Sequence, residues 1–325
     1  MPHPFATHVG VRRLMTAAIA APSVHNTQPW FFRLDEDAAV LELHADTDRG
    51  LPVIDPRGRA LHISCGAALF NLRLAIRVTG HRPLIEPFPD AARRPALLAA
   101  VRAADAPMPS PTQSELYATI PHRRTNRRPF GKRRVPQAVR DELTAAAREE
   151  GAVLSLPGPQ TTAYLLSLIA AADARLVADP AYLAELARWT PDRTRGDGVP
   201  WYAFGPRPTG RGLPLRDFGP AGPAGQAGGR EIDDFASRPQ LGVLLTRGDG
   251  PQDWLRAGQA LQRVLLTAAR RGVSSSLLSQ LLDAHGSGPA EPQPHGHIQS
   301  IIRFGYGPLV PGTPRRPFPE VLERV

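Results

Sequence analysis

The 325-residue sequence contains one cysteine, Cys65, and one lysine, Lys132. A single cysteine excludes an intrachain disulfide and a cysteine-ligated metal cluster, and it fits a reducing compartment. No apolar run approaches the roughly 20 residues that a membrane-spanning helix needs. The N-terminus, Met1-Pro2-His3-Pro4-Phe5, has no charged region followed by an apolar one, so we expect no signal peptide. These absences predict a cytoplasmic protein with no membrane partner.

Motifs that mark several other enzyme classes are also absent. The sequence has no Gly-x-Ser-x-Gly, no Walker sequence and no Gly-x-Gly-x-x-Gly after a predicted strand. A loop rich in proline and glycine contains three histidines, His285, His295 and His297. The one acidic residue that this loop brings beside them is Glu291. A metal site needs a set of ligands in defined geometry. We therefore expect an exposed loop there and no metal.

Positive charge is in excess: the net charge is +9 at pH 7 and the pI is about 10.7. This balance is compatible with a polyanion-binding protein. The arginines are scattered along the whole chain, however, so we expect no specific nucleic-acid partner. Hydrophobic residues make up 42% of the chain and charged residues 21%, as in ordinary globular proteins, which allows a sizeable core.

Helix and strand patterns together predict an α+β fold. Apolar residues surround the segment 61–78 almost completely, and Gly80 follows as a cap, so we expect a deeply buried helix there. The acidic turn at 35–37 joins two strand patterns as a hairpin. Residues 105–112, with three prolines, are predicted to be a linker. Further helices are predicted at 9–20, 137–150, 160–178, 180–189 and 253–271, and strands at 31–34, 40–44, 84–86, 152–156, 240–246 and 297–304.

The element pattern repeats along the chain. The helices at 61–78 and 253–271 each end at a glycine, and each follows a helix–strand unit. This predicts two similar halves, 1–115 and 116–325, packed as an intramolecular pseudo-dimer. Such a chain is consistent with a monomer.

Residues 190–238 carry most of the glycine and proline, together with Trp201, Tyr202, Phe204 and Phe218. The segment is too long for a plain connection, so it is either a lid over a binding site or a disordered loop.

The most informative stretch is Ala21-Pro22-Ser23-Val24-His25-Asn26-Thr27-Gln28-Pro29-Trp30. A proline near each end restricts the backbone, so the loop holds hydroxyl and amide groups in a fixed array. Taken alone, it is more typical of a helix-to-strand connection in which Ser and Asn form the turn.

The second informative stretch is His122-Arg123-Arg124-Thr125-Asn126-Arg127-Arg128-Pro129-Phe130. Guanidinium groups bind phosphate oxygens in bidentate fashion. Arg124, Asn126 and Arg128 alternate, so an extended segment would direct them to one side and one anion. Arg303, at the end of the last predicted strand, either joins that anion or extends its charge to solvent. A solvated basic face is the alternative for the whole run.

Together the two stretches resemble the nitroreductase superfamily. The first resembles its flavin-contacting loop, and the second its phosphate-binding pattern of basic-x-Ser-x-basic-x-Phe, with Asn126 in place of Ser. In ordinary members the basic segment begins the chain and two subunits share each flavin. Here both stretches lie in one chain in inverted order, which resembles the Acg-type branch. The resemblance covers roughly residues 10–310 and implies a nitroreductase-like fold and bound FMN.

The resemblance also implies which residues hold the cofactor. Those of the loop and of the basic segment would contact the flavin and its phosphate, with Arg303 assisting. Residues after the long C-terminal helix would donate a backbone N–H to flavin N5. The implied cofactor-binding residues are Pro22, Ser23, Asn26, Gln28, Arg124, Asn126, Arg128, Ser279, Gln280 and Arg303. No side-chain catalyst is implied, because the flavin carries the two-electron chemistry.

Two functions are compatible with this reading. One is an oxidoreductase that takes electrons from NADH or NADPH, which would visit the flavin by stacking, and reduces small electrophilic acceptors by a ping-pong route. The other is an FMN sequestration or storage protein, in which the segment 190–238 blocks turnover. The discriminating feature is whether that segment covers the flavin.

Overall fold

The computed structural model describes residues 3–191, 195–208, 213–219, 231–233, 235, 239–283 and 296–325. It confirms the predicted α+β fold. The α-helices are α1 His8–Ile19, α2 Arg59–Arg77, α3 Pro111–Thr119, α4 Gln137–Glu149, α5 Pro159–Val177, α6 Pro180–Arg188, α7 Pro251–Arg270 and α8 Gln280–Asp283. The strands are β1 Trp30–Asp35, β2 Val40–Ala45, β3 His81–Pro87, β4 Leu97–Asp105, β5 Val153–Ser155, β6 Arg207–Pro208, β7 Ile232–Asp233, β8 Gln240–Thr246, β9 Ser274–Leu277, β10 His297–Gly305 and β11 Leu322–Arg324.

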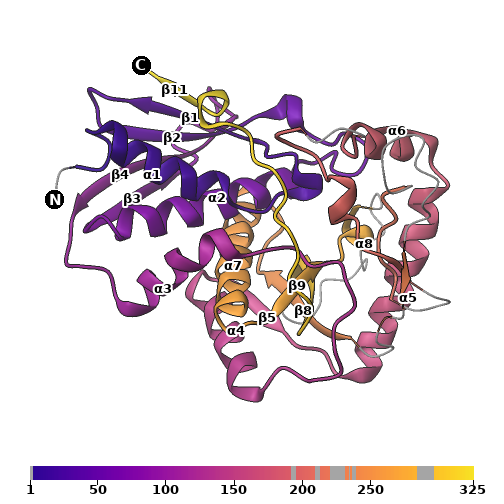
Figure 1. The fold of residues 1–325 in the computed structure, drawn as a ribbon. Coiled ribbons are helices and arrows are strands. Elements are labelled where there is room, and N and C mark those ends of the chain that lie inside the picture. The colour runs from indigo at the N-terminus through magenta and orange to yellow at the C-terminus, as the bar shows by residue number, and fades with distance from the viewer. Residues whose placement is uncertain are drawn as a thin grey trace.

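The strands form two main sheets that lie on either side of α2 and α7 (Figure 1). The first has the order β11-β1-β2-β4-β3 and the second β5-β8-β10-β9, and β6 pairs with β7 in a small third sheet. The C-terminal strand β11 pairs in parallel with β1, so the end of the chain returns to the first sheet. The last strand of the chain thus lies in the same sheet as β1 to β4, and the division into halves 1–115 and 116–325 stays a prediction.

The centre of the molecule is the crossing of α2 and α7, where two glycines let the helix backbones touch. A Cβ added to Gly66 would lie 2.2 Å from the carbonyl oxygen of Leu255, and one added to Gly258 would lie 2.0 Å from that of Ile63. No side chain fits at either position, because real Cβ atoms do not approach so closely. The helices α2 and α7, which lie between the two sheets, thus pack with their backbones in direct contact at Gly66 and Gly258.

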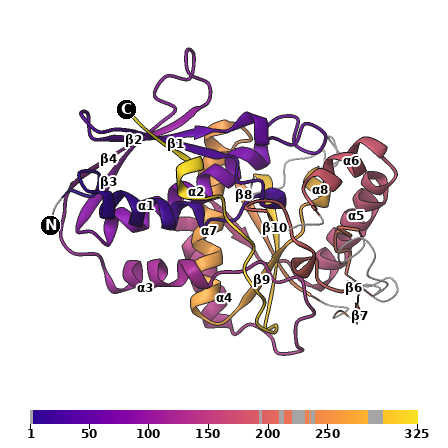
Figure 2. The same cartoon turned by 45° about the horizontal axis from the view of Figure 1, so that its top comes forward.

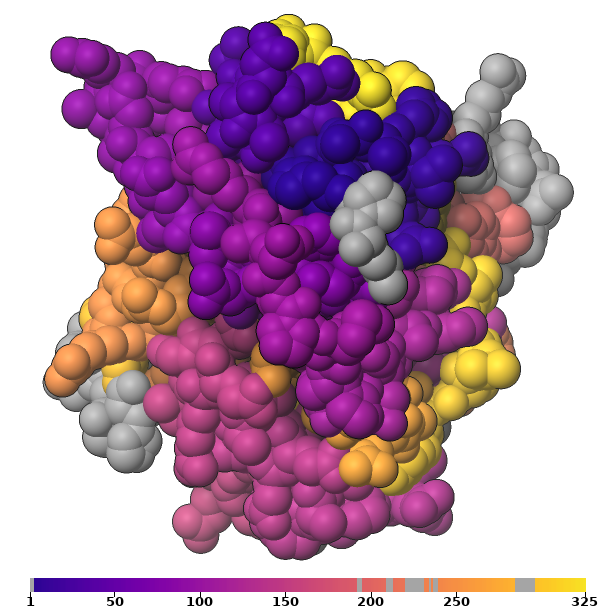
Figure 3. Space-filling model, turned by 90° about the vertical axis from the view of Figure 1, so that its left-hand side faces the viewer, coloured from indigo at the N-terminus to yellow at the C-terminus, as the bar shows by residue number. Residues whose placement is uncertain are grey.

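A buried polar chain also links three helices beside this crossing. Asn71 of α2 donates Nδ2 to the carbonyl oxygen of Ala17 in α1 at 2.8 Å, and its Oδ1 accepts from Nε2 of Gln262 in α7 at 2.7 Å. Asn71 and Gln262 are fully buried, so these bonds fix how the helices align. Figure 3 shows the side that lies on the left in Figure 1: indigo and purple residues lie above the magenta ones, and orange residues reach the surface at the left edge and at the lower right.

A second group of helices, α5, α6 and α8, lies together on the other flank (Figure 2). Ile169 and Tyr182 are buried there in the cluster that also contains Phe218 and Phe235. Among the described residues no single helix is long and apolar enough to cross a membrane; α5 and α6 meet both conditions only as a pair, which is bent by 90°.

Eleven of the twelve predicted helices and strands agree with the structure within two residues at each end, including the hairpin of β1 and β2. The exception is the strand predicted at 84–86, because β3 already begins at His81. The predicted linker at 105–112 is wrong at both ends. Asp105 closes β4, and α3 begins at Pro111 with Ser110 as its N-cap and Gln113 completing a capping box. The capping signal Ser-Pro-x-Gln was therefore present in the sequence.

One ion pair on the first sheet makes a test of the fold. Glu42 of β2 accepts from both terminal nitrogens of Arg94, at 2.7 and 2.5 Å, and these bonds lower the pKa of Glu42 from 4.5 to about 2. A carboxyl group with a lowered pKa stabilises the fold above its unfolded pKa, and this contribution is lost as the pH falls from about 4.5 to about 2. Arg94 is partly exposed, so the pair is worth about 1 kcal/mol.

We expect Glu42→Gln to lower the free energy of unfolding by about 1 kcal/mol at pH 7 and by much less at about pH 3. Urea unfolding of both proteins at the two pH values measures this. An equal loss at both would show that Glu42 acts through packing and not through its charge.

Candidate functional site

The loop between α1 and β1 is held in a strained shape. His25, Asn26 and Gln28 have φ angles of 46°, 55° and 53°, a region that residues other than glycine seldom occupy. Ser23 stabilises the turn because its Oγ accepts from the backbone N–H of Gln28 at 2.9 Å. Strain of this kind persists only where surrounding contacts enforce it, and it concentrates at functional sites.

Those contacts come from two distant segments of the chain. Asn26 donates Nδ2 to the carbonyl oxygens of Gly198 and Pro314, at 2.9 and 3.1 Å. Gln28 donates Nε2 to the carbonyl oxygen of Gly196 at 2.8 Å, and its Oε1 accepts from the backbone N–H of Arg316 at 2.8 Å. Gln28 is fully buried, so its amide cross-links the loop and does not reach a cavity.

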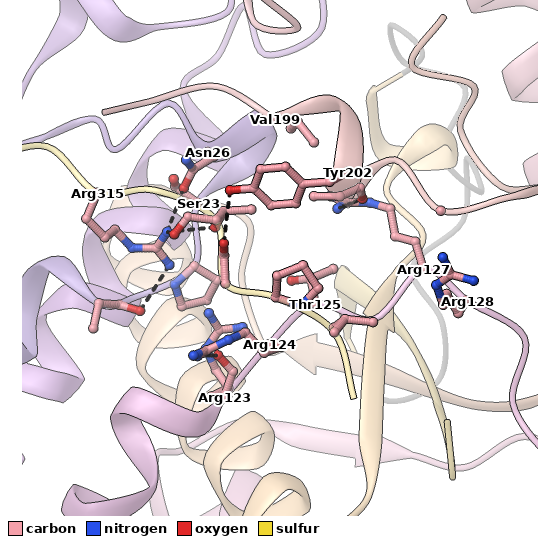
Figure 4. Close-up of a pocket in the computed structure, with 18 of the residues that line it drawn as sticks. Ser23, Asn26, Arg123, Arg124, Thr125, Arg127, Arg128, Val199, Tyr202 and Arg315 are labelled. Atoms are coloured by element: carbon pink, nitrogen blue, oxygen red, sulfur yellow. Dashed lines mark hydrogen bonds between the residues drawn. The ribbon is translucent and has the colours of Figure 1, made fainter. Parts of the chain in front are cut away.

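A cavity of about 460 Å³ lies between this loop and the arginine segment (Figure 4). Ser23, Asn26 and Arg315 lie on one side of it, Tyr202 and Val199 border it from the segment 195–208, and Arg124 lies across from Tyr202. The volume is in the range of small-molecule and cofactor sites. We call it the larger cavity, because a smaller cavity adjoins it. The arginines that line the larger cavity are Arg123, Arg124, Arg127, Arg128 and Arg315.

The charge around the larger cavity is unbalanced. None of the described residues that line it is acidic. Arg123 is 5% exposed, and within the described chain its Nε and Nη1 have no hydrogen-bond partner. Burial and the nearby Arg315 and Arg124 lower the pKa of Arg123 to about 9, and burial together with Arg124 lowers the pKa of Arg315 to about 10. A buried, unpartnered guanidinium is costly, and an anion in the cavity would offset that cost.

The predicted common direction of Arg124, Asn126 and Arg128 is found for the two arginines but not for Asn126. Arg124 and Arg128 line the larger cavity. Asn126 instead donates Nδ2 to the carbonyl oxygen of Pro308 at 2.8 Å, while its Oδ1 accepts from the backbone N–H of Arg128 at 3.0 Å. The segment makes one isolated bridge, between Thr125 and Ser275, so it is not a regular strand and its side chains do not alternate.

Arg303 of β10 lies behind the arginine segment. Its Nη2 donates to the carbonyl oxygens of Asn126 and Arg128, at 3.0 and 2.9 Å, and its guanidinium lies 3.8 Å from the ring centre of Phe130. Arg303 is 3% exposed, so the alternative in which it extends to solvent is wrong. The side chain braces the main chain that carries Arg124 and Arg128.

A smaller cavity of about 120 Å³ adjoins the larger one, and Pro22, Ser23, Thr125 and Arg127 line both. Its other walls are largely apolar, from α2, α7 and β9, and it ends at Ser279, which precedes α8, and at Asp283, the last residue of α8.

Arg216 and Phe218 close part of the smaller cavity from the predicted lid region. Arg216 is buried and hydrogen-bonds to Asp283, Ser279 and the hydroxyl of Tyr182. Burial raises the pKa of Asp283, and the adjacent Arg216 opposes that rise. This network ties residues 213–219 to α8.

The structure thus gathers most of the predicted cofactor-binding residues around the two cavities. Pro22, Ser23, Asn26, Arg124 and Arg128 line the larger one, and Ser279 lines the smaller. Gln280 donates Nε2 to the carbonyl oxygen of Pro214 at 3.1 Å and, like Gln28, Asn126 and Arg303, lines neither. A cofactor contact for any of these ten residues stays a prediction.

The lining residues that were not predicted to bind the cofactor include His25, Arg123, Arg216 and Arg315. Arg315 lies between prolines in Pro314-Arg315-Arg316-Pro317, a second stiff basic segment that the sequence did contain. Within the described chain no group of three or more His, Cys, Asp and Glu side chains could hold a metal. His285 and His295 lie outside the described residues, so the prediction about them is untested.

Relatives of known sequence decide the family. The chain is 32% identical over 330 residues to "Putative NAD(P)H nitroreductase Rv3131" of Mycobacterium tuberculosis, an alignment that covers 96% of this chain and 91% of that protein. The chain belongs to the nitroreductase superfamily. It is also 27% identical over 336 residues to "Putative NAD(P)H nitroreductase acg" of the same organism, covering 99% and 98% of the two chains. The predicted Acg-type membership is confirmed, although no protein-family model matches the chain.

Solved nitroreductase structures align with lower similarity. A structure described as "a putative nitroreductase" from Anabaena variabilis has a TM-score of 0.43 at 12% identity, covering 91% of this chain and 73% of the other. A nitroreductase with bound FMN from Desulfitobacterium hafniense has a TM-score of 0.39 at 13% identity, covering 65% and 98%.

Proposed function

We propose that this superfamily member binds FMN across the two adjoining cavities and uses NADH or NADPH to reduce small electrophilic acceptors. The phosphate of FMN would lie in the larger cavity, among the arginines, and its ring would lie toward the smaller one. Relatives at 32% and 27% identity are named as NAD(P)H nitroreductases, and aligned nitroreductase structures contain FMN.

The observation that carries the proposal is the uncompensated charge of the larger cavity. Arg123 is buried with two nitrogens unpartnered among the described groups, and Arg124 and Arg315 add to the same positive field. A phosphate group supplies two negative charges and several acceptor oxygens at one point, which suits a cluster of guanidinium groups. The residues present therefore fit the anionic end of FMN.

The two cavities also differ in polarity in a way that suits the two ends of FMN: the larger is lined by arginines and the smaller is mostly apolar. When bound, FMN supplies the two-electron chemistry. The chain's own residues bind and orient it: Arg124 and Arg128 bind the anionic end, and Ser23 and Thr125 lie where the two cavities meet. The mostly apolar smaller cavity excludes water from whatever ring occupies it. Arg303 keeps the arginine segment in place from behind.

A direct test of the function is reconstitution. Purified protein mixed with FMN should retain the yellow chromophore near a 1:1 ratio after gel filtration. Anaerobic addition of NADH or NADPH should then bleach it, and a nitroarene should restore the colour. Protein that binds no FMN would contradict the proposal as a whole.

We expect the double variant Arg124→Ala, Arg128→Ala to weaken FMN binding at least tenfold and riboflavin binding hardly at all, since riboflavin lacks the phosphate. Arg128 is also paired with Glu231, at 3.1 Å, and both side chains are largely exposed, so the loss is smaller than for a fully buried charge. Flavin fluorescence quenching measures both affinities. Equal losses for the two flavins would show that these arginines do not hold the phosphate.

FMN sequestration is the alternative function. Residues 213–219 pack over the smaller cavity through Leu215, Arg216 and Phe218, which is what a cover would do. Flavin that binds but resists reduction by NADH and NADPH, while dithionite bleaches it, would favour storage. Three further features belong to the proposed function as a whole: a lid between 190 and 238, a pseudo-dimer of two halves, and a cytoplasmic location. Much of 209–238 lies outside the described residues.

A further inference from the structure

His25 is a buried imidazole whose polar atoms are unused by the described protein. It is 6% exposed and lines the smaller cavity. Neither Nδ1 nor Nε2 has a hydrogen-bond partner among the described residues. Its ring packs edge-on against Phe218, with the ring centres 6.0 Å apart. A buried polar group without a partner costs free energy, so a ligand group is the natural partner for this imidazole.

The backbone places the ring there at a cost. His25 has φ 46° and ψ 20°, and it stands in a three-residue turn between Val24 and Asn26. Holding a residue other than glycine in the left-handed backbone region costs of order 1–3 kcal/mol of folding free energy. Asn26 and Gln28 enforce it here through their bonds to Gly198 and Arg316. These contacts, which lie outside the smaller cavity, thus maintain the strained backbone, and the strained backbone keeps the imidazole of His25 inside the cavity.

Burial, together with the surrounding positive charges, keeps this imidazole neutral. Burial lowers the pKa of His25 well below its ordinary value, and Arg216 and Arg127 lower it further. The charged groups that line the cavity with it are Arg59 of α2, Arg127 of the arginine segment, Arg216, and Asp283 of α8, which is paired with Arg216. A neutral imidazole offers one donor and one acceptor.

We propose that His25 is a specificity-determining residue whose imidazole hydrogen-bonds to the polar edge of the flavin ring in the smaller cavity. The proposal rests on the proposed function, because it takes the flavin as the ligand. The pyrimidine edge of a flavin presents both carbonyl and N–H groups, so whichever imidazole nitrogen faces it, the donor or the acceptor, finds one hydrogen-bond partner there. The two ends of FMN are then read separately, the phosphate by the arginines and the ring by His25.

The test compares two variants with two flavins. His25→Leu keeps the bulk of the side chain and removes both nitrogens; His25→Gln keeps a donor and an acceptor, and Gln28 shows that a glutamine occupies φ 53° in this loop. Loss of one buried hydrogen bond corresponds to about 5–10-fold in affinity. We expect His25→Leu to weaken riboflavin and FMN by that same factor, and His25→Gln to stay within about threefold of the wild type.

A second readout does not depend on any variant binding well. In protein labelled with ¹⁵N-histidine, the signal that His25→Gln removes should show a neutral imidazole at pH 7 and should shift when riboflavin is added. A His25 signal that saturating riboflavin leaves unchanged, or a His25→Leu protein that binds both flavins like the wild type, would overturn the inference while the proposed function stands. Wild-type protein that binds neither flavin would overturn both.

Discussion

Replacing Arg123 by methionine is expected to stabilise the ligand-free protein and to weaken FMN binding about a hundredfold. Arg123 is 5% exposed, and its Nε and Nη1 have no partner within the described chain. Replacing a buried charge by an apolar side chain of similar length is often stabilising by about 1–4 kcal/mol, and we expect a gain of about 1–3 kcal/mol here. A buried charge-assisted contact to phosphate is worth about 1.5–3 kcal/mol, hence the loss of affinity.

The opposite signs of these two effects make the prediction sharp. Urea unfolding without ligand and fluorescence titration with FMN measure them on the same preparation. Arg93→Met, at an exposed arginine, is the matched control and should change neither quantity appreciably. A less stable Arg123→Met protein with unchanged FMN affinity would mean that Arg123 supports the fold and not the ligand.

The sequence predicted the site better than it predicted the roles of individual polar residues. The loop from Pro22 and the segment from Arg124 were expected to meet, and they line one cavity. Which of their amides face that cavity was not predictable, because their partners lie far along the chain. Asn126 is held by Pro308, and Gln28 by the backbone of Arg316.

The strands that the sequence analysis missed share one physical reason: their conformation is set by pairing and not by local pattern. Ser274–Leu277 contains three serines and no apolar alternation, and it is a strand because it pairs with β10. Leu97–Asp105 is rich in alanine, which favours helix, yet it pairs between β2 and β3. Leu322–Arg324 became a strand by returning to β1. Long helices such as α2 and α7 needed no partner to be predicted.

Gly66→Ala is expected to lower the free energy of unfolding by about 3 kcal/mol or more. In an exposed helix the same change would stabilise by about 1 kcal/mol, because alanine is the better helix former. Here the added Cβ would lie 2.2 Å from the carbonyl oxygen of Leu255 and close to the Cα of Gly258. The clash is with backbone, so no rotamer change relieves it, and overpacking outweighs helix propensity. Urea unfolding against Gly131→Ala, where the nearest atom is 3.6 Å away, isolates the effect.

The same crossing sets the width of the smaller cavity. Ile63 and Ala67 of α2 and Leu261 of α7 line it, within one turn of Gly66 and Gly258. Helices forced apart by Gly66→Ala would widen the cavity, so riboflavin binding should weaken together with stability. Gly258→Ala acts on the same contact, so the double variant should lose less stability than the sum of the two single losses. Strict additivity, or a more stable Gly66→Ala protein, would show that the two helices do not meet at these glycines.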